Sequence, residues 1–288
     1  MAWTRPHVNG SLLAQADQDQ QSLSRHMKTL ALEDGSTLQV LDVGQGDPVL
    51  LLPMIDELNF VYAPQIEEFQ SDYRVLLYVP RLSDRHRFGI PDRANEALSF
   101  MRRLGIERAH IIVWGDTGSA AYYLAKHHPQ KVRSIVFIGL ADRYKFPQPY
   151  QLLMQLLARL PLEGLVPSWL FAAILSRVVG GTQVKPRWIA RRAAKVPRLA
   201  RLFKLSILPN LTDHEPMPGE VRAPCLVISG DNDRIVSAAQ ARRMSKLLPN
   251  VRRTAIIPGG EHFVSYLDSA TVNGLIRQFY AEVNATAT

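Results

Sequence analysis

Short, fully apolar runs that alternate with helix-like segments are the feature that most limits the fold of this chain. The apolar runs stand at 49–52, 73–80, 109–114, 132–139, 223–230 and 252–259. Helical patterns stand at 91–104, between 115 and 128, and at 269–283. Strands buried on both faces show such runs, and helices between them connect parallel strands. The sequence therefore predicts an α/β fold, with a mainly parallel sheet that helices cover on both faces.

The remaining segments predict an antiparallel edge, a terminal extension and an insertion. Two alternating apolar runs flank the pair Asp34 and Gly35, a pattern typical of a β-hairpin. Residues 1–26 are rich in Gln, Asp and Ser, so we expect a flexible or loosely helical extension. Residues 143–215 carry helical patterns without a clear strand. We expect them to form a helical cap over one end of the sheet, inserted between core segments 27–142 and 216–288.

The charge of the chain is concentrated in the expected cap. The whole chain has a net charge of +8, and residues 143–215 contain twelve Lys or Arg against three Asp or Glu. A solvated basic helix face explains this most simply. Two further hypotheses are a docking site for an acidic partner, such as an acyl carrier protein, and one for an anionic membrane surface. No nucleic-acid-binding motif accompanies the charge, so nucleic acid is not expected as a partner.

Several classes of protein do not fit the sequence. The single cysteine, Cys225, excludes an internal disulfide framework, and its apolar surroundings predict a buried, inert thiol. No secretory signal and no apolar run of membrane-spanning length are recognisable, so we expect a cytoplasmic protein. The sequence contains no metal-binding cluster and no dinucleotide fingerprint, so we expect no metal and no cofactor.

Two polar residues follow apolar runs in the last third of the chain. Asp233 lies in "PCLVISGDNDRIV" (224–236), and His262 lies in "IIPGGEHFVSYLDSATVNGLIRQFY" (256–280). Parallel strands place the loops at their carboxyl ends side by side, and a carboxylate that accepts the imidazole N–H fixes the tautomer of a histidine. We therefore expect an Asp233–His262 pair, with Asp231 as the fallback acid. Glu261 is expected to point to solvent.

These motifs resemble those of the α/β-hydrolase superfamily over nearly the whole chain after residue 27. "LGIERAHIIVWGDTGSAAYYLAKHHPQKVRSIVFIG" (104–139) is similar to the nucleophile strand, elbow and helix of that family. The order of nucleophile, acid and histidine is also the order of the family. The resemblance implies an α/β-hydrolase fold with an inserted helical cap, in which His262 is the general base and Asp233 its acid partner.

The nucleophile elbow departs from the family because no serine stands at the turn. Thr117 fits the small-residue pattern and has a hydroxyl, but it is β-branched, and such residues avoid positive φ. Asp116 tolerates positive φ better, but it places Trp114 where the pattern has a small residue. The spacing of the motifs on either side favours Gly115, which suits a strained turn and carries no nucleophile. The three registers remain open at this point.

The expected oxyanion site also departs from the family. Pro53, Met54 and Ile55 follow the apolar run 49–52, where most members have His-Gly. Backbone N–H groups of Met54 or Ile55, together with the backbone at Gly115, are expected to serve there. We expect Pro53, Trp114 and Phe263 to line the pocket.

Three hypotheses for function follow. The first is a hydrolase of ester, thioester, epoxide or halide type that acts on a hydrophobic small-molecule or acyl substrate with Thr117 or Asp116 as nucleophile. The second is a non-hydrolytic lyase, cyclase or isomerase without a covalent nucleophile. The third is a non-catalytic binding protein of the same fold.

Overall fold

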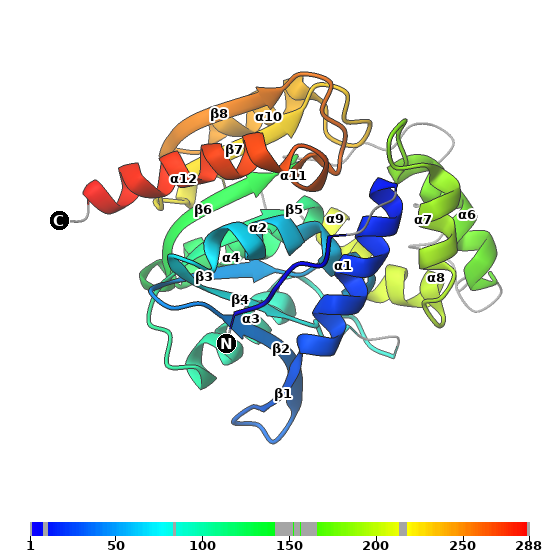
Figure 1. The fold of residues 1–288 in the computed structure, drawn as a ribbon, viewed down its shortest axis with the longest axis horizontal. Coiled ribbons are helices and arrows are strands. Elements are labelled where there is room, and N and C mark those ends of the chain that lie inside the picture. Colours follow the sequence, from blue (N-terminus) through cyan, green and yellow to red (C-terminus); the bar gives the residue numbers. More distant parts are fainter. Residues whose placement is uncertain are drawn as a thin grey trace.

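An eight-stranded sheet organises the molecule in the computed structural model (Figure 1). The structure describes residues 2–7, 11–82, 85–141, 166–212 and 218–286, together with Leu152 and Leu156. The strands lie in the order β1-β2-β4-β3-β5-β6-β7-β8. They are β1 (Lys28–Ala31), β2 (Thr37–Val43), β3 (Asp47–Leu52), β4 (Tyr73–Tyr78), β5 (Ala109–Trp114), β6 (Val132–Ile138), β7 (Cys225–Gly230) and β8 (Val251–Ile257).

The pairing of the strands confirms the predicted sheet. The hairpin β1–β2 is antiparallel, and β2 pairs antiparallel with β4. From β4 to β8 every neighbouring pair is parallel. The carboxyl ends of β3, β5, β6, β7 and β8 therefore lie along one edge of the sheet, where the loops that carry the expected site residues emerge.

Helices cover both faces of this sheet (Figure 1). The longer ones are α1 (Leu12–His26), α2 (Ala63–Phe69), α3 (Ile90–Arg103), α4 (Gly118–His127), α6 (Ser168–Val179), α7 (Pro186–Ala193), α10 (Ala238–Leu247) and α12 (Ser269–Ala285). Short helices are η1 (Asp56–Tyr62), η2 (Gly115–Thr117), η3 (Pro129–Lys131), α8 (Leu199–Leu202), the π-helix η5 (Phe203–Ile207), α9 (Leu208–Thr212), η6 (Pro218–Glu220) and α11 (Val264–Leu267).

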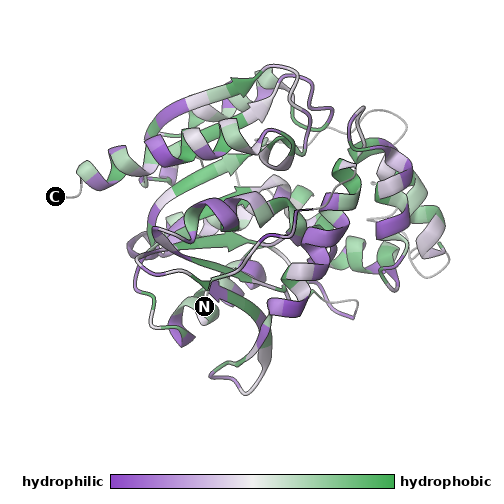
Figure 2. Ribbon diagram, viewed as in Figure 1, coloured by the Kyte–Doolittle hydropathy of each residue, from purple (hydrophilic) through white to green (hydrophobic). Residues whose placement is uncertain are grey.

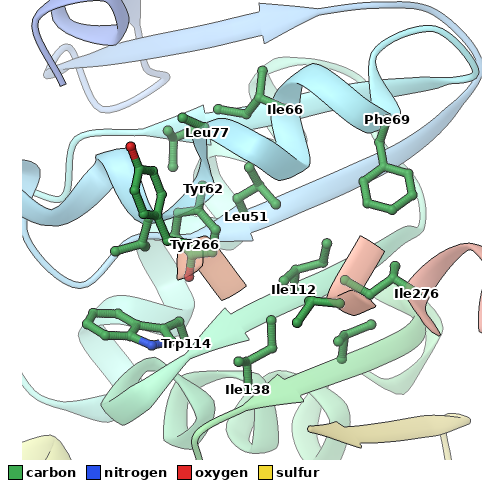
Figure 3. Packing of buried hydrophobic residues seen from close by; sticks show 14 of the residues in the cluster. Leu51, Tyr62, Ile66, Phe69, Leu77, Ile112, Trp114, Ile138, Tyr266 and Ile276 are labelled. Atoms are coloured by element: carbon green, nitrogen blue, oxygen red, sulfur yellow. The ribbon is translucent and has the colours of Figure 1, made fainter. Parts of the chain in front are cut away.

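Alternate residues of the central strands enter two separate hydrophobic cores. In β3, Val49 and Leu51 join the core under α2 and α12, whereas Leu50 and Leu52 join the core under α3, α4 and α10. Figure 3 shows the first core, in which Leu51 and other apolar residues of adjacent strands meet side chains of α2 and α12. Such two-sided burial explains why these strands read as continuous apolar runs rather than as alternating ones.

Cys225, at the start of β7, is buried as expected. Burial raises the pKa of its thiol to about 12, so the thiol stays protonated and inert at neutral pH.

The N-terminal segment was expected to be flexible or loosely helical. Residues 12–26 do form a helix, α1, but it packs firmly on the body of the protein. The indole of Trp3 is buried and donates to Ser22 Oγ at 3.1 Å. Asp19 is also buried, paired with Arg5 at 2.9 Å, and accepts a hydrogen bond from the Tyr266 hydroxyl at 2.7 Å. The polar composition was misleading because these polar side chains bind one another inside the interface instead of facing water.

Helices α6 to α9 lie between β6 and β7 in the chain. Helices α6, α7 and α8 gather at one end of the molecule, whereas α9 lies closer to the sheet (Figure 1). Together these helices coincide with the carboxyl half of the expected cap 143–215. Most of the first part of that range, 142–165, lies outside the described residues, as does 213–217. Among the described residues no helix is both long enough and apolar enough to cross a membrane.

Candidate active site

Asp233 and His262 meet at the carboxyl edge of the sheet. Nδ1 of His262 lies 2.9 Å from Oδ2 of Asp233, and both residues are buried. The other carboxylate oxygen, Oδ1, accepts the backbone N–H groups of Ile235 at 2.7 Å and Val236 at 3.0 Å. Two backbone donors therefore fix the carboxylate so that its second oxygen faces the imidazole.

The environment keeps Asp233 ionised. Burial alone raises the pKa of this carboxyl, but the charge and hydrogen bond of His262, with the N–H groups of Val236 and Ile235, lower the pKa below its ordinary value. A carboxylate held in this way orients the imidazole and stabilises its protonated form. Asp231, the fallback acid, is exposed and accepts the Gly259 N–H at 2.6 Å, so it does not contact His262.

Gly115 occupies the elbow. Its φ is +64°, whereas the only non-glycine residue with positive φ in the described chain is Arg198. A Cβ atom built on Gly115 would lie 3.8 Å from Nε2 of His262, with no other atom closer than 4 Å beyond its chain neighbours. The turn therefore presents to the histidine a residue that has no side chain, and of the three registers the backbone adopts that of Gly115.

Thr117 does not reach the histidine. Its hydroxyl donates to the Trp114 carbonyl at 3.0 Å, and it lines a separate small void together with Pro53. The structure thus separates Thr117 from the imidazole that would have to activate it. Pro53 likewise lies outside the lining of the cavity that holds His262.

Asp116 lies beside the elbow rather than at it. It lines the same cavity as His262, and its Oδ2 lies 3.8 Å from Nη2 of Arg93. Both members of this ion pair are buried. An aspartate held by a guanidinium is a weaker nucleophile than a free carboxylate, because the ion pair stabilises its negative charge.

Arg93, in α3, is a residue of the site that sequence reasoning missed. Its Nη1 donates to the carbonyls of Pro53 and Met54, each at 3.2 Å, and its Nη2 donates to the Ser206 carbonyl at 3.0 Å. One guanidinium thus holds the loop after β3, the residue after the elbow and the π-helix η5. The available signal was an arginine on the apolar stripe of a helix, one turn before Ala97.

Arg93 also determines which way the expected oxyanion donors point. In a trans peptide the C=O and the following N–H point in opposite directions. Because Arg93 binds the carbonyls of Pro53 and Met54, the N–H groups of Met54 and Ile55 point away from Arg93. Met54 and Ile55 line the cavity, as expected for that loop.

Trp114 and Phe263 also line this cavity, as expected. The Trp114 indole donates to the His262 carbonyl at 2.9 Å, and its ring lies 4.9 Å from the imidazole and 5.0 Å from the Phe263 ring, between centroids. Gly139, with φ +62°, leaves space for the pair, because a Cβ there would lie 3.4 Å from Nδ1 of His262. Close packing on two sides therefore sets the position of the imidazole.

The expectation that Glu261 points to solvent is wrong. It is only 4% exposed and accepts the Thr182 N–H at 2.6 Å, the Thr182 hydroxyl, and the Gln183 N–H at 3.2 Å. Burial raises the pKa of this carboxyl, but the bonds from Thr182 and Gln183 outweigh it and lower the pKa below its ordinary value. The residue before His262 thus holds the turn between α6 and α7.

The cavity beside His262 has a volume of about 110 Å³ and a mainly apolar lining. Helices α6 and α7 contribute Leu175, Val179, Trp188 and Ile189, and the segment 199–211 contributes further apolar side chains. The cation in the lining, Arg192, is already bound to Asp17 at 2.5 Å and to the Glu57 carbonyl at 2.7 Å. Its charge is therefore used within the protein.

Comparisons with known proteins agree with this architecture. No protein-family model matches the chain. A curated relative, the 2-(acetamidomethylene)succinate hydrolase of Mesorhizobium japonicum, is 26% identical over 250 residues, which span 80% of this chain and 86% of the relative.

Solved structures share the fold at lower sequence identity. A meta-cleavage product hydrolase from Pseudomonas fluorescens superposes with a TM-score of 0.70 at 19% identity, covering 88% of this chain and 97% of that one. The enol-lactonase of Burkholderia xenovorans superposes with a TM-score of 0.68 at 17% identity, covering 88% and 100%. The chain therefore has the α/β-hydrolase fold, and the resemblance identified in its sequence motifs is confirmed.

Proposed function

We propose that this protein is a hydrolase in which His262, oriented by Asp233, activates a water molecule directly, without a covalent enzyme intermediate. The observation that carries the proposal is Gly115 at the elbow, facing Nε2 of His262. A serine at this position would bring its hydroxyl to Nε2. With glycine, the same space accepts a water that hydrogen-bonds Nε2 and attacks the substrate carbonyl.

The remaining groups fit this reaction. His262 takes a proton from the water as general base, and Asp233 stabilises the resulting imidazolium. The imidazolium then returns the proton to the leaving group as the tetrahedral intermediate collapses and the bond to that group breaks. The backbone N–H groups of Met54 and Ile55, turned away from Arg93, stabilise the oxyanion that forms on the substrate. The role of Asp116 is to hold Arg93 rather than to attack the substrate.

The cavity supports a hydrophobic substrate. Its lining is mainly apolar, and its cation is bound by Asp17 and Glu57. Burial of an apolar substrate group in such a site is favourable by about 25 cal/mol per Å². In this proposal α6 to α9 act as the cap that encloses the substrate, and Glu261 keeps the α6–α7 turn closed over the site. The named relatives are hydrolases of small molecules, which agrees with this class of reaction.

The glycine at the elbow also favours a second candidate, a lyase or isomerase. An imidazole base in an apolar cavity without a nucleophile can remove a proton from carbon, which starts an elimination or an isomerisation. This reaction needs the same His262–Asp233 pair but no water at Gly115.

Hydrolysis of p-nitrophenyl acetate and butyrate by the purified protein tests the first proposal. We expect turnover that favours butyrate, and we expect His262→Ala and Asp233→Asn to lower it by about 100-fold or more, because each removes the activated base. Turnover that the His262→Ala variant retains in full would overturn the proposal. If the protein does not hydrolyse these esters but catalyses deuterium exchange at an acidic carbon, and the exchange requires His262, the second candidate is favoured.

A further inference from the structure

Helix α6 exposes an apolar face. Trp169 is 65% exposed and Leu170 is 39% exposed, and both lie in the first turn of the helix. One turn further, Ile174 is partly exposed, and the exposed Arg177 follows near the end of the helix. Leu170, Ile174 and Arg177 are spaced by four and three, so they form a stripe on one side of the helix, and Trp169 adjoins its first residue. Figure 2 shows α6 as largely hydrophobic at the outer end of the molecule.

The exposed large apolar side chains are concentrated in one part of the sequence. Six such residues are exposed in the described part of the chain, and four of them fall between positions 152 and 170: Leu152, Leu156, Trp169 and Leu170. Single exposed apolar residues are normal, but Trp169 and Leu170 are adjacent, large and both exposed, which indicates a binding surface.

The segment that contains this stripe is strongly basic and has no acidic residue. Residues 166–212 contain nine Lys or Arg and neither Asp nor Glu. Five of the cations are exposed and form no ion pair with any described residue: Arg177, Lys185, Arg187, Arg191 and Lys195. The positive charge of this segment alone exceeds the net charge of the whole chain, which is +8.

The packing of α7 against α6 places these cations at the carboxyl end of α6 and along the neighbouring α7 segment. The α6–α7 turn brings Lys185 and Arg187 next to the carboxyl end of α6, where Arg177 lies. At the other end, the Leu199 N–H donates to Ser168 Oγ at 3.1 Å, so the start of α8 lies against the first turn of α6. The surface therefore combines the exposed apolar residues of α6 with cations at its carboxyl end and on α7.

We propose that this surface, formed by α6 and α7, docks the protein on an anionic membrane surface. Tryptophan and leucine enter the region between headgroups and acyl chains, while flanking Lys and Arg bind anionic headgroups. Each cation close to an anionic leaflet adds to the attraction. The exposed indole of Trp169 and the adjacent Leu170 favour a bilayer over an acidic protein, because salt bridges to an acidic protein would not require them. The proposal concerns binding alone and is independent of the proposed hydrolysis.

Sedimentation of the full-length protein with vesicles tests this surface. We expect binding to vesicles of phosphatidylcholine with 30 mol% phosphatidylglycerol, at least tenfold weaker binding to phosphatidylcholine alone, and release by 0.5 M NaCl. The tryptophan emission should shift to the blue on binding, and the shift should be lost in Trp169→Phe. Trp3 and Trp114 are buried and Trp188 is partly buried, so Trp169 dominates the shift.

Helix α10 supplies matched controls, because it also exposes three cations, Arg242 and Lys246 among them, and a leucine, Leu247, which is 42% exposed. Trp169→Ser with Leu170→Ser, and Arg187→Glu with Arg191→Glu, should each lower vesicle binding tenfold or more. Leu247→Ser, and Arg242→Glu with Lys246→Glu, should change it less than twofold.

The proposal would be overturned if the α10 control variants lost as much vesicle binding as the α6 and α7 variants, or if the wild-type protein did not bind anionic vesicles. Binding that survives the Trp169 and Leu170 replacements and that soluble polyglutamate abolishes would also overturn it, and would assign the surface to an acidic protein. Circular dichroism of every variant establishes that each one is folded.

Discussion

A Cβ atom placed on Gly115 would lie 3.8 Å from Nε2 of His262. The elbow and the histidine thus keep the geometry of a nucleophile and its base, but the residue at the nucleophile position has no side chain. This relationship supports direct activation of water, and it allows the missing group to be restored by one substitution.

Gly115→Ser should convert the protein into one that is acylated. The serine hydroxyl would reach Nε2 of His262, so the variant should react with a fluorophosphonate probe and release p-nitrophenol in a burst. Positive φ costs a non-glycine residue about 1–2 kcal/mol, so some loss of thermal stability is expected. Gly115→Ala is the control, since it carries the same strain without the hydroxyl. Equal labelling of the alanine and serine variants would contradict this geometry.

Arg93→Met should lower kcat about 10- to 100-fold with a smaller change in KM, because the loop at Pro53 and Met54 loses the anchor that directs its N–H groups. It should also destabilise the protein by about 3–5 kcal/mol, because the buried carboxylate of Asp116 loses its cation. Thermal unfolding and steady-state kinetics measure the two effects.

The double variant Arg93→Met with Asp116→Asn separates these effects. Neutralising Asp116 should recover much of the lost stability without restoring kcat. Recovery of kcat in the double variant would contradict a positioning role for Arg93.

Glu261→Gln should loosen the α6–α7 turn, because a neutral amide oxygen accepts the bonds from Thr182 and Gln183 more weakly than the carboxylate does. Hydrogen exchange at residues 181–184 should accelerate about tenfold, while exchange in β7 stays unchanged. The pKa of Glu261 is lowered in the folded protein, so this contribution is present above the ordinary glutamate pKa and is lost as the pH falls through the folded value. Unchanged exchange in the turn would show that Glu261 does not hold it.

His110 should make the protein less stable in mild acid. It is buried in β5, where burial, followed by the nearby Arg133, lowers its pKa to about 4. The unfolded chain takes up this proton first, so the stability is fully present above the ordinary histidine pKa of about 6.5 and is lost as the pH falls toward 4. Between pH 7.5 and 5, urea unfolding should show a loss of about 2 kcal/mol more than in His110→Asn. Parallel pH profiles of the two proteins would contradict the assignment.

Most of the fold was predictable because it depends on residues whose pattern is local. Two-sided burial made strands such as Ala109–Trp114 recognisable, and the glycines before Asp233 and His262 identified the loops at the strand ends. The contact between Asp233 and His262 follows from the parallel order of β7 and β8.

The rest depends on contacts between segments far apart in the chain. Arg93 binds carbonyls about 40 and 113 positions away, and Glu261 binds a turn 78 and 79 positions away. The packing of helix α1 on the body of the protein was not predicted, because its polar residues bind distant partners such as Tyr266. The residue at the elbow is the one that has positive φ. The sequence left three candidates for it, and the backbone of the structure identifies Gly115.

The most direct test of the central claim is the intact mass of the wild-type protein, quenched while it hydrolyses p-nitrophenyl butyrate, with His262→Ala measured in parallel. Direct activation of water by His262 predicts turnover that depends on His262 and a protein mass that stays unmodified throughout. A butyryl adduct on the wild-type protein, at Thr117, Asp116 or elsewhere, would contradict it.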